Sequence, residues 1–247
     1  MVFGVGSFAH AVMTILKESG AEVCCYLTRG YGHHGPSLAV FDSEEFPSPI
    51  PLIDSFQPDL IVPMSIAWTE QPWAKEIAKK PILSPVGSAM QIEISRSMAA
   101  NLCNRFDVPV PEFFHAESKE EAIEIINDNP RPYVLKNPIC SPFSPVHTIV
   151  CETVEDTLGW IERIDDSEGI FLQEYFGTAE AGHFVFISEG KIQSLVTNQE
   201  YKRSFTGNMG PVAGAPLGGI AQVDPEDQYG LAKELIHPLQ PWFSESG

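Results

Sequence analysis

The chain has 247 residues, 43% of them hydrophobic, which is enough to bury one large core or two small ones. Its 33 Asp and Glu residues outnumber its 15 Lys and Arg residues, so the formal net charge is −18. Such a charge repels nucleic acid and anionic lipid, and neither is expected as a partner. A phosphate-bearing small molecule can bind only where local cations, backbone amides or a metal ion reverse the field.

Cysteine usage and the N-terminus predict a cytoplasmic protein. An odd number of cysteines without Cys-x-x-Cys spacing is typical of reduced thiols. The apolar N-terminus lacks a basic flank and is interrupted by glycines, so no signal peptide is predicted. The absence of an apolar run of about 18 residues predicts no membrane span. The cysteines are Cys24, Cys25, Cys103, Cys140 and Cys151.

The first third of the chain alternates predicted strands and helices. It opens with a buried strand that ends in glycines, followed by a helix and a second strand. This unit is typical of the start of a parallel α/β sheet. The predicted strands are 2–6, 22–28, 58–65 and 82–85, and the predicted helices are 7–20 and 69–80.

After about residue 86 the pattern changes to α+β, with largely antiparallel strands. Ser118 and Glu121 form a capping box, and Asp224 followed by Pro225 suits the start of a helix. The predicted helices are 87–106, 120–128, 154–164 and 226–237. The predicted strands are 108–114, 132–137, 147–153 and 170–176, and two more within 183–203 that are joined at 188–191.

Three short segments are candidates for binding a nucleotide, each with a plain structural alternative. The Gly4–Ser7 turn enters a helix, where a phosphate can approach the backbone, but position 9 is Ala, and a tight packing turn explains it equally well. Lys136 ends an apolar strand and can meet a triphosphate, or it lies along the surface. Glu174 and Glu180 flank the end of another strand and can hold ribose hydroxyls, or they are solvated acids.

The segment 197–216, TNQEYKRSFTGNMGPVAGAP, is the strongest candidate. Strand alternation places Gln199, Tyr201 and Arg203 on one face and Glu200 and Lys202 on the other. The glycines that follow permit close approach of the backbone to a ligand. We interpret the segment as a local positive patch for phosphate in an acidic protein.

These segments, in this order, resemble the phosphoribosylamine–glycine ligases of the ATP-grasp superfamily. The resemblance runs from VFGVGSFAHA through PDLIVP to SPVGSAMQIEISRSMAANLCNRFDVPVP, where Glu93, Ser95 and Arg96 stand at the family's Glu-x-Ser-Lys positions. PYVLKN is similar to its Val-Val-Lys strand, and LQEYFGTAE to its Glu-Glu-Phe-Leu hinge and following Glu. NQEYKRSFTGNMG, the most specific match, is similar to its Gln-Asp-His-Lys-Arg run and Gly-Gly-Met-Gly.

The chain also departs from that family pattern. Where the family has a glycine-rich flap with a second lysine, this chain has NPICSPFSPVHTIV, with three prolines and no glycine or lysine. Glu200 and Tyr201 replace Asp and His, and Arg96 replaces Lys. The family's metal-binding Glu and Asn correspond to positions beyond residue 247. We therefore expect nucleotide binding without turnover by these 247 residues, and a loop 137–145 that is a stiffer phosphate cover than a glycine flap.

The resemblance implies an α/β and α+β fold with two domains. Residues 1–85 would form a Rossmann-like pre-ATP-grasp domain, and residues 86–247 an ATP-grasp domain that is incomplete at its C-terminus. It implies an enzyme that uses ATP, with Mg²⁺ or Mn²⁺, to join glycine to phosphoribosylamine. It also implies that the protein is a monomer or a weak homodimer. It identifies no metal ligand. The implied catalytic residues are Lys202 and Arg203; the implied ATP contacts are Arg96, Lys136, Glu174, Tyr175, Phe176 and Glu180; the implied substrate contacts are Gly4, Gly6, Ser7, Gln199, Glu200, Asn208 and Gly210.

Three alternatives stay open at this point. One is a non-catalytic nucleotide-binding relative, favoured by the loss of the glycine flap. Another is an ATP-grasp ligase with a different acceptor. The third is an oxidoreductase that binds a dinucleotide at the Gly4–Ser7 turn, and it is disfavoured because no acid follows the second strand to hold a ribose.

Overall fold

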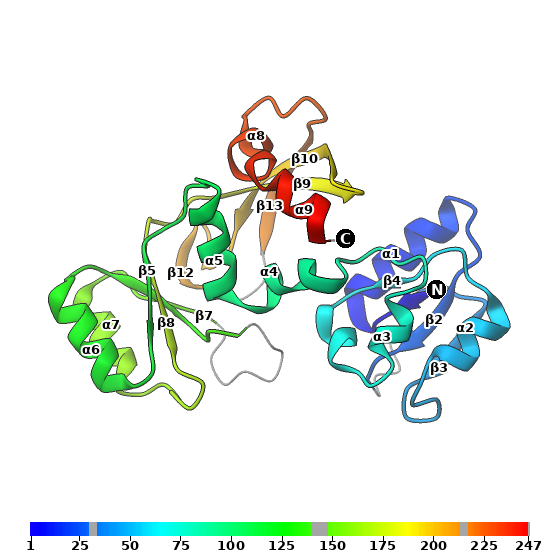
Figure 1. Cartoon of the computed structure of the whole chain (residues 1–247), viewed down its shortest axis with the longest axis horizontal. Coiled ribbons are helices and arrows are strands. Elements are labelled where there is room, and N and C mark those ends of the chain that lie inside the picture. The colour runs from blue at the N-terminus through cyan, green and yellow to red at the C-terminus, as the bar shows by residue number, and fades with distance from the viewer. Residues whose placement is uncertain (30–33, 140–147, 213–216, 247) are drawn as a thin grey trace. The chain divides into compact units, whose positions relative to one another are not determined.

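The computed structural model describes residues 1–29, 34–139, 148–212 and 217–246 (Figure 1). The chain divides into two compact units, Met1–Gly87 and Ser88–Gly247, and each is described by itself. Among the described residues, no helix is long and apolar enough to cross a membrane.

The first unit is a four-stranded parallel sheet flanked by helices, in the order β3-β2-β1-β4. Its central strands are apolar because helices cover them: Val2 and Met13 are fully buried and belong to one core cluster. Gly4 is required by packing, since a Cβ there would lie 2.8 Å from Met64 Cβ. The strands are β1 (Val2–Phe3), β2 (Cys24–Leu27), β3 (Ala39–Asp42) and β4 (Val62–Pro63), and the helices are α1 (Gly6–Glu18), α2 (Ile50–Phe56), η1 (Ile66–Glu70) and α3 (Ala74–Ile77).

Two predictions for the first unit are wrong in detail. The predicted helix 69–80 is only a 3-10 turn and the short helix α3, because Gln71, which precedes Pro72, is extended. The predicted strand 82–85 is reduced to a single bridge between Ile82 and Ile61. Strand β3 and helix α2 were not predicted, since their segment lacks a clear hydrophobic period.

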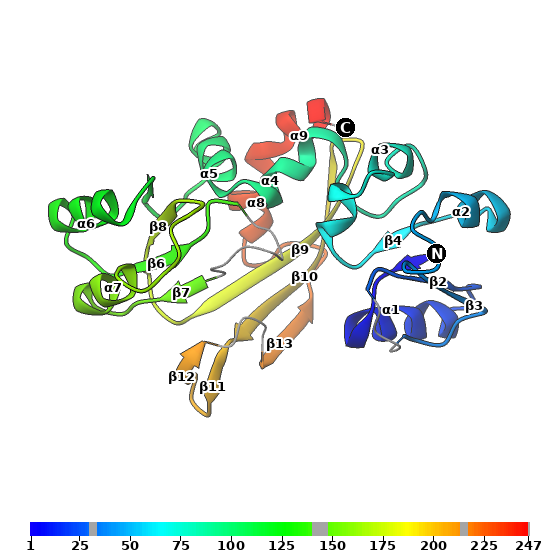
Figure 2. The ribbon, with the colours of Figure 1, turned by 90° about the horizontal axis from the view of Figure 1, so that it is seen from below.

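The second unit contains an antiparallel sheet covered on one face by two helices (Figure 2). Tyr133, Leu135 and Leu172 from the sheet form a core with Ile126 and Ile161 from the helices, and all five are fully buried. As predicted, 132–137 and 147–153 contain paired strands. The sheet order is β5-β8-β6-β7, with β5 (Phe113–Ala116), β6 (Tyr133–Lys136), β7 (Thr148–Val150), β8 (Ile170–Glu174), α6 (Lys119–Asp128) and α7 (Val154–Ile161).

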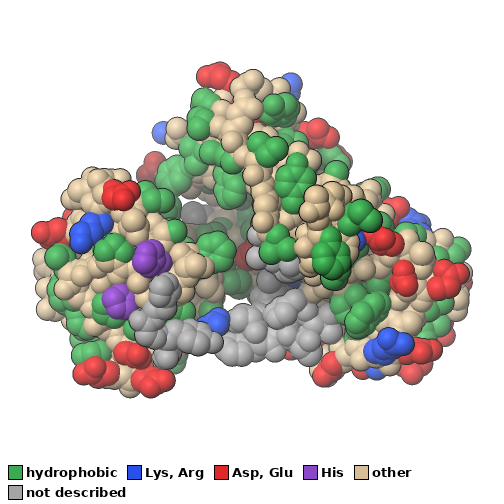
Figure 3. Space-filling view, turned by 180° about the vertical axis from the view of Figure 1, so that it is seen from behind, with side chains coloured by type: hydrophobic (Ala, Val, Ile, Leu, Met, Phe, Trp, Pro, Cys, Tyr) green, Lys and Arg blue, Asp and Glu red, His purple; other side chains and the backbone are tan. Residues whose placement is uncertain are grey.

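A second sheet, β13-β10-β9, and the hairpin β11-β12 follow. One face of the sheet contacts the last helices, whereas Phe184, Phe186 and Val223 are exposed. Hydrophobic side chains gather at the top of the view in Figure 3, where this sheet lies. The bounds are β9 (Glu180–Ser188), β10 (Lys191–Tyr201), β11 (Arg203–Phe205), β12 (Met209–Val212), β13 (Gly218–Val223), α8 (Leu231–Leu235), η3 (His237–Leu239) and α9 (Gln240–Ser246).

The predicted helix 87–106 is broken at Ser95. The segment forms η2 (Gly87–Met90), α4 (Gln91–Ile94) and α5 (Arg96–Arg105). Ser95 is extended and its hydroxyl accepts from Met98 N–H, so it begins a new helix. Tertiary pairing causes the break, because Ser95 bridges to Ile139 and Arg96 N–H donates to the Pro138 carbonyl.

The predicted helix after Asp224 is also wrong at its start. Helix α8 begins only at Leu231, after Gly230, whose φ of 71° lies in the left-handed region. The Asp224 and Asp227 carboxylates accept N–H groups of the intervening turn and of the first helical residues. These side chains satisfy the backbone donors that a continuous helix would otherwise use.

Candidate functional site

A cavity of about 650 Å³ lies in the second unit, between the two sheets. Strands β6, β7 and β8 line one side, and the residues after β8 and β10 line the other. It brings together eight of the predicted site residues, which come from four separate segments. These are Lys136, Glu174, Tyr175, Phe176, Glu180, Lys202, Arg203 and Asn208.

Lys202 and Arg203 both line this cavity, so the predicted strict alternation through residue 203 is wrong. Strand β10 ends at Tyr201, and Arg203 already belongs to β11 in a different sheet. The chain turns between the two sheets, and adjacent side chains therefore reach the same space. This turn places two positive charges in the wall of the cavity, although the overall protein is acidic.

Lys202 is held by two carboxylates. Its Nζ lies 2.5 Å from Glu180 Oε2 and 3.2 Å from Glu200 Oε2. The hydrogen bond to Glu180 raises the pKa of Lys202, with a smaller contribution from Glu200 and against the effect of burial. Hydrogen bonds from Asn198 and Lys202 lower the pKa of Glu200. Lys202 is therefore charged near neutral pH, and any anion that contacted it would have to share or displace its acidic partners.

Arg203 is anchored at two points, and its side chain is only 14% exposed. Nη1 donates to the Gly210 carbonyl at 2.9 Å, and Nη2 donates to Glu152 Oε1 at 2.6 Å. The same Glu152 oxygen accepts from the Tyr175 hydroxyl at 3.2 Å. Gly210, predicted as a substrate contact, acts here through its carbonyl, and a Cβ at its φ of 82° would collide with Phe205.

The end of β8 and Lys136 of β6 also line the cavity. Lys136 Nζ donates to Gln173 Oε1 at 2.6 Å. Arg131 Nη1 contacts Glu112 at 2.6 Å and Glu174 at 3.2 Å, which fixes the Glu174 carboxylate beside the strand. Sequence reasoning missed Arg131 and Glu152, since neither belongs to a recognisable motif.

Of the three backbone N–H groups at Glu174–Phe176, which were predicted to contact ATP, two already donate to carbonyls of the protein. Glu174 N–H donates to the Glu112 carbonyl, and Tyr175 N–H donates to the Pro132 carbonyl. Across the described ranges, no backbone carbonyl accepts from Phe176 N–H. Of the three amides, that of Phe176 is the donor left for a planar ligand.

Several predicted site residues lie elsewhere. Arg96 lines a smaller adjoining hollow of about 230 Å³, which shares Gln173 with the main cavity, and its Nε donates to the Asn137 carbonyl. Gln199 lines a shallow hollow beside β13, and Glu200 reaches the cavity through its ion pair with Lys202. Gly4, Gly6 and Ser7 lie in the first unit, where Gly6 and Ser7 begin α1. Most of the proline-rich loop predicted to cover phosphate, including Pro142 and Pro145, lies outside the described residues.

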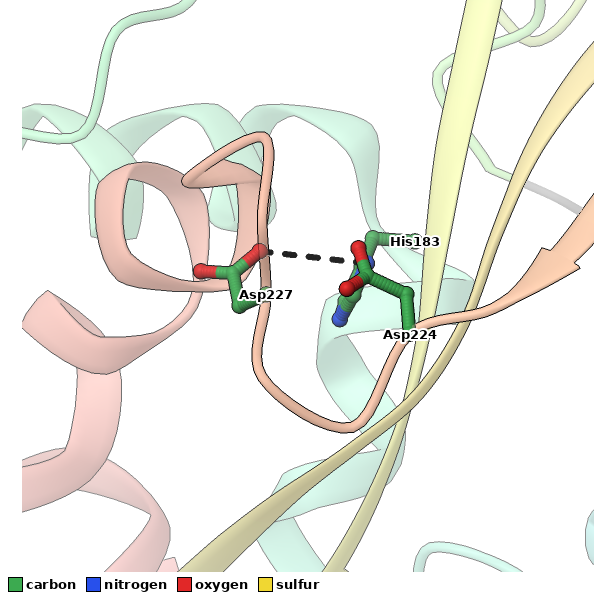
Figure 4. A group of neighbouring side chains, drawn as sticks. All are labelled: His183, Asp224 and Asp227. Carbon is green, nitrogen blue, oxygen red and sulfur yellow. Dashed lines mark ion pairs between the residues drawn. The ribbon is translucent and has the colours of Figure 1, made fainter.

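His183, Asp224 and Asp227 form a buried polar cluster beside α8 (Figure 4). His183 Nδ1 lies 2.7 Å from Thr197 Oγ1, which donates to Asp224 Oδ2 at 2.7 Å. The remaining carboxylate oxygens accept backbone N–H groups of the turn and of the first residues of α8. Each carboxylate oxygen thus has a hydrogen-bond donor, which supports a structural role in joining the turn to strands β9 and β10.

Comparisons with known proteins identify the fold. No family model matches the chain. It is 27% identical over 162 residues to the phosphoribosylamine–glycine ligase of Lactococcus lactis, a match covering 65% of this chain and 37% of that protein. It is similar to the crystal structure of phosphoribosylamine–glycine ligase from Thermotoga maritima, with a TM-score of 0.66, 20% identity and coverage of 99% of this chain and 60% of that one.

The chain is also similar to N5-carboxyaminoimidazole synthetase from Staphylococcus aureus, solved in complex with ADP, with a TM-score of 0.65 and 14% identity over 99% of this chain and 62% of that one. The chain thus spans between 37% and 62% of the length of these three relatives. The ATP-grasp fold and the resemblance predicted from sequence are confirmed.

Proposed function

We propose that this chain binds ATP in the cavity between its two sheets and is part of an ATP-dependent carboxylate–amine ligase. The observation that supports this most is the meeting of Lys136, Lys202 and Arg203 with the Phe176 amide around one space of about 650 Å³. Three cations that line one cavity, in a chain of net charge −18, are suited to neutralising phosphate. The curated relatives that share the fold are ligases.

Each side chain has a distinct part in this proposal. Phe176 N–H donates to the adenine ring, and Glu180 accepts from ribose after exchanging its contact with Lys202. Lys136, Lys202 and Arg203 neutralise the phosphates, including the charge that develops on the transferred phosphoryl group. Arg96 acts from the adjoining hollow, and Asn208 contributes to the lining of the main cavity.

The proposed reaction is the one for which the similar proteins, phosphoribosylamine–glycine ligases, are named. A carboxylate oxygen of glycine attacks the γ-phosphorus of ATP, and ADP leaves with its electron pair. The amine of phosphoribosylamine then attacks the acyl carbon, phosphate leaves, and the amine loses a proton. Gly6 and Ser7 of the first unit begin α1, and amides at a helix N-terminus suit an anion, so they are proposed for the 5′-phosphate. Gly4, whose own N–H donates to the Tyr26 carbonyl, is proposed to let the ligand approach the backbone there. Gln199, Glu200 and Gly210 are proposed to contact the substrates that react with ATP.

A divalent ion, Mg²⁺ or Mn²⁺, fits the chemistry of this proposal but has no assigned ligand. The carboxylates that line the cavity, Glu174 and Glu180, are paired with Arg131 and Lys202. When bound, such an ion supplies charge neutralisation of the phosphates.

Binding and turnover test the proposal separately. Calorimetry is expected to show binding of ATP with Mg²⁺ and none of NAD, and the reverse result would refute the nucleotide assignment. ADP release on adding glycine and phosphoribosylamine would support the specific reaction. ATP binding without release, in a protein that includes every segment of the natural gene product, would favour the non-catalytic relative, and release with another carboxylate and amine would favour a different acceptor.

A further inference from the structure

Glu152 is the acidic residue that contacts Arg203 beside the cavity. It follows β7 and precedes Thr153, whose hydroxyl caps helix α7, so the Glu152 side chain is not required to begin that helix. Its Oε1 accepts from Arg203 Nη2 at 2.6 Å and from the Tyr175 hydroxyl at 3.2 Å. The contact joins two segments 51 residues apart, one that follows β7 and one that begins β11.

The position of the Arg203 guanidinium does not depend on Glu152 alone. Nη1 donates to the Gly210 carbonyl at 2.9 Å, and the side chain is 14% exposed. Glu152, in contrast, is 50% exposed and has a flexible side chain that can turn into solvent. A ligand that displaces the Glu152 carboxylate would therefore meet a guanidinium already held in place.

A carboxylate and a phosphate present the same kind of oxygen acceptor to a guanidinium. Two such anions cannot share one guanidinium edge without mutual repulsion. We propose that Glu152 competes internally with a ligand phosphate for Arg203 and so sets the affinity of the cavity for phosphate-bearing ligands. The inference rests on the proposed function, because it assigns the cavity to a nucleotide.

A ligand phosphate can replace the Glu152 carboxylate at Arg203 only if the ion pair between Glu152 and Arg203 is weak. Partly exposed ion pairs are generally weak, so their loss changes affinity by about fivefold at most. Removing the competitor should thus tighten phosphate binding by a measurable but limited factor. Were Glu152 needed instead to position Arg203, its removal would weaken binding.

The test compares Glu152→Gln with Glu155→Gln. The first keeps an amide oxygen that can accept from Tyr175 and Arg203 but removes the charge. The second removes the same charge from an exposed position in the first turn of α7. Calorimetry with ATP plus Mg²⁺ is expected to show affinity about fivefold tighter for Glu152→Gln and unchanged for Glu155→Gln. Adenosine, which carries no phosphate, should bind both variants like the original protein.

The outcomes separate this inference from the function on which it rests. Equal or weaker ATP binding by Glu152→Gln, with the original protein still binding ATP, would overturn the inference alone. An equal gain in both variants would also overturn it, since the cause would then be the overall charge. Absence of ATP binding by all three proteins would overturn both the inference and the nucleotide assignment. Thermal unfolding of each variant confirms that the protein compared is folded.

Discussion

Two lysines of the second unit differ in their relation to the cavity. Lys136 ends β6 and lines the cavity, whereas Lys191 begins β10 at the exposed β9–β10 turn. We predict that Lys136→Ala weakens ATP binding by about tenfold or more, because one charge-assisted phosphate contact is lost. Lys191→Ala removes the same charge from the whole molecule and should leave affinity unchanged. Equal affinities of the two variants, measured by calorimetry, would remove Lys136 from the site.

Single residues also show how far sequence reasoning reached. Lys136, Lys202 and Arg203 could be selected because basic residues are scarce and the motif is specific. Glu152 could not, because one Glu among 33 acids carries no signal until Arg203 lies 2.6 Å from it. The assignment of Arg96 to the phosphates rested on the resemblance, and in the structure its guanidinium donates to a backbone carbonyl beside a separate hollow.

At the scale of elements, the turn between β13 and α8 depends on an ionised Asp224. The backbone N–H of Gln228, and then the Thr197 hydroxyl, lower the pKa of Asp224 below its ordinary value. A lowered folded-state pKa means that the ionised group stabilises the protein fully above about pH 4, and that this stabilisation is lost as pH falls through the folded pKa.

Asp224→Asn should therefore lower the melting temperature most near neutral pH. The difference from the original protein should narrow as the pH is lowered from about 4 toward 2, because protonation then removes the same charge from Asp224. Asp128→Asn, at an exposed position at the end of α6, serves as the control for losing one acidic charge. Thermal unfolding followed by circular dichroism over this pH range checks the prediction. A constant difference at every pH would contradict it.

Helices and strands could be predicted where the local sequence contains both the hydrophobic period and the residues that begin or end the element. The capping residue Ser118 begins α6, and its hydroxyl accepts from Glu121 N–H as expected. The helix 87–106 was wrong because its local pattern is helical throughout, while the bridge from Ser95 to Ile139 is a tertiary interaction. The turn between β10 and β11 was missed for the same reason, since strand alternation carries no information about which sheet a residue joins.

At the scale of the whole molecule, the charge of −18 should make nucleotide binding depend on a divalent cation. Free ATP is a polyanion, and the acids around Lys202 and Arg203 already offset part of their charge. We predict that ATP binds about tenfold more weakly in EDTA than with Mg²⁺, because the complexed nucleotide carries less charge to desolvate and repel. Adenosine is the control and should bind equally in both buffers. Equal ATP affinities in the two buffers would contradict the prediction.

The sequence by itself determined the class of fold, the order of its segments and the residue types able to hold phosphate. These follow from hydrophobic period, capping residues and motif spacing, which are local properties. Only the tertiary structure decided that Lys202 and Arg203 reach the same cavity and that Glu152 contacts Arg203. It also decided that, within the described part of the chain, the Phe176 N–H has no backbone acceptor. These contacts join positions far apart in the chain, and their geometry arises when separate sheets pack, not from any one segment.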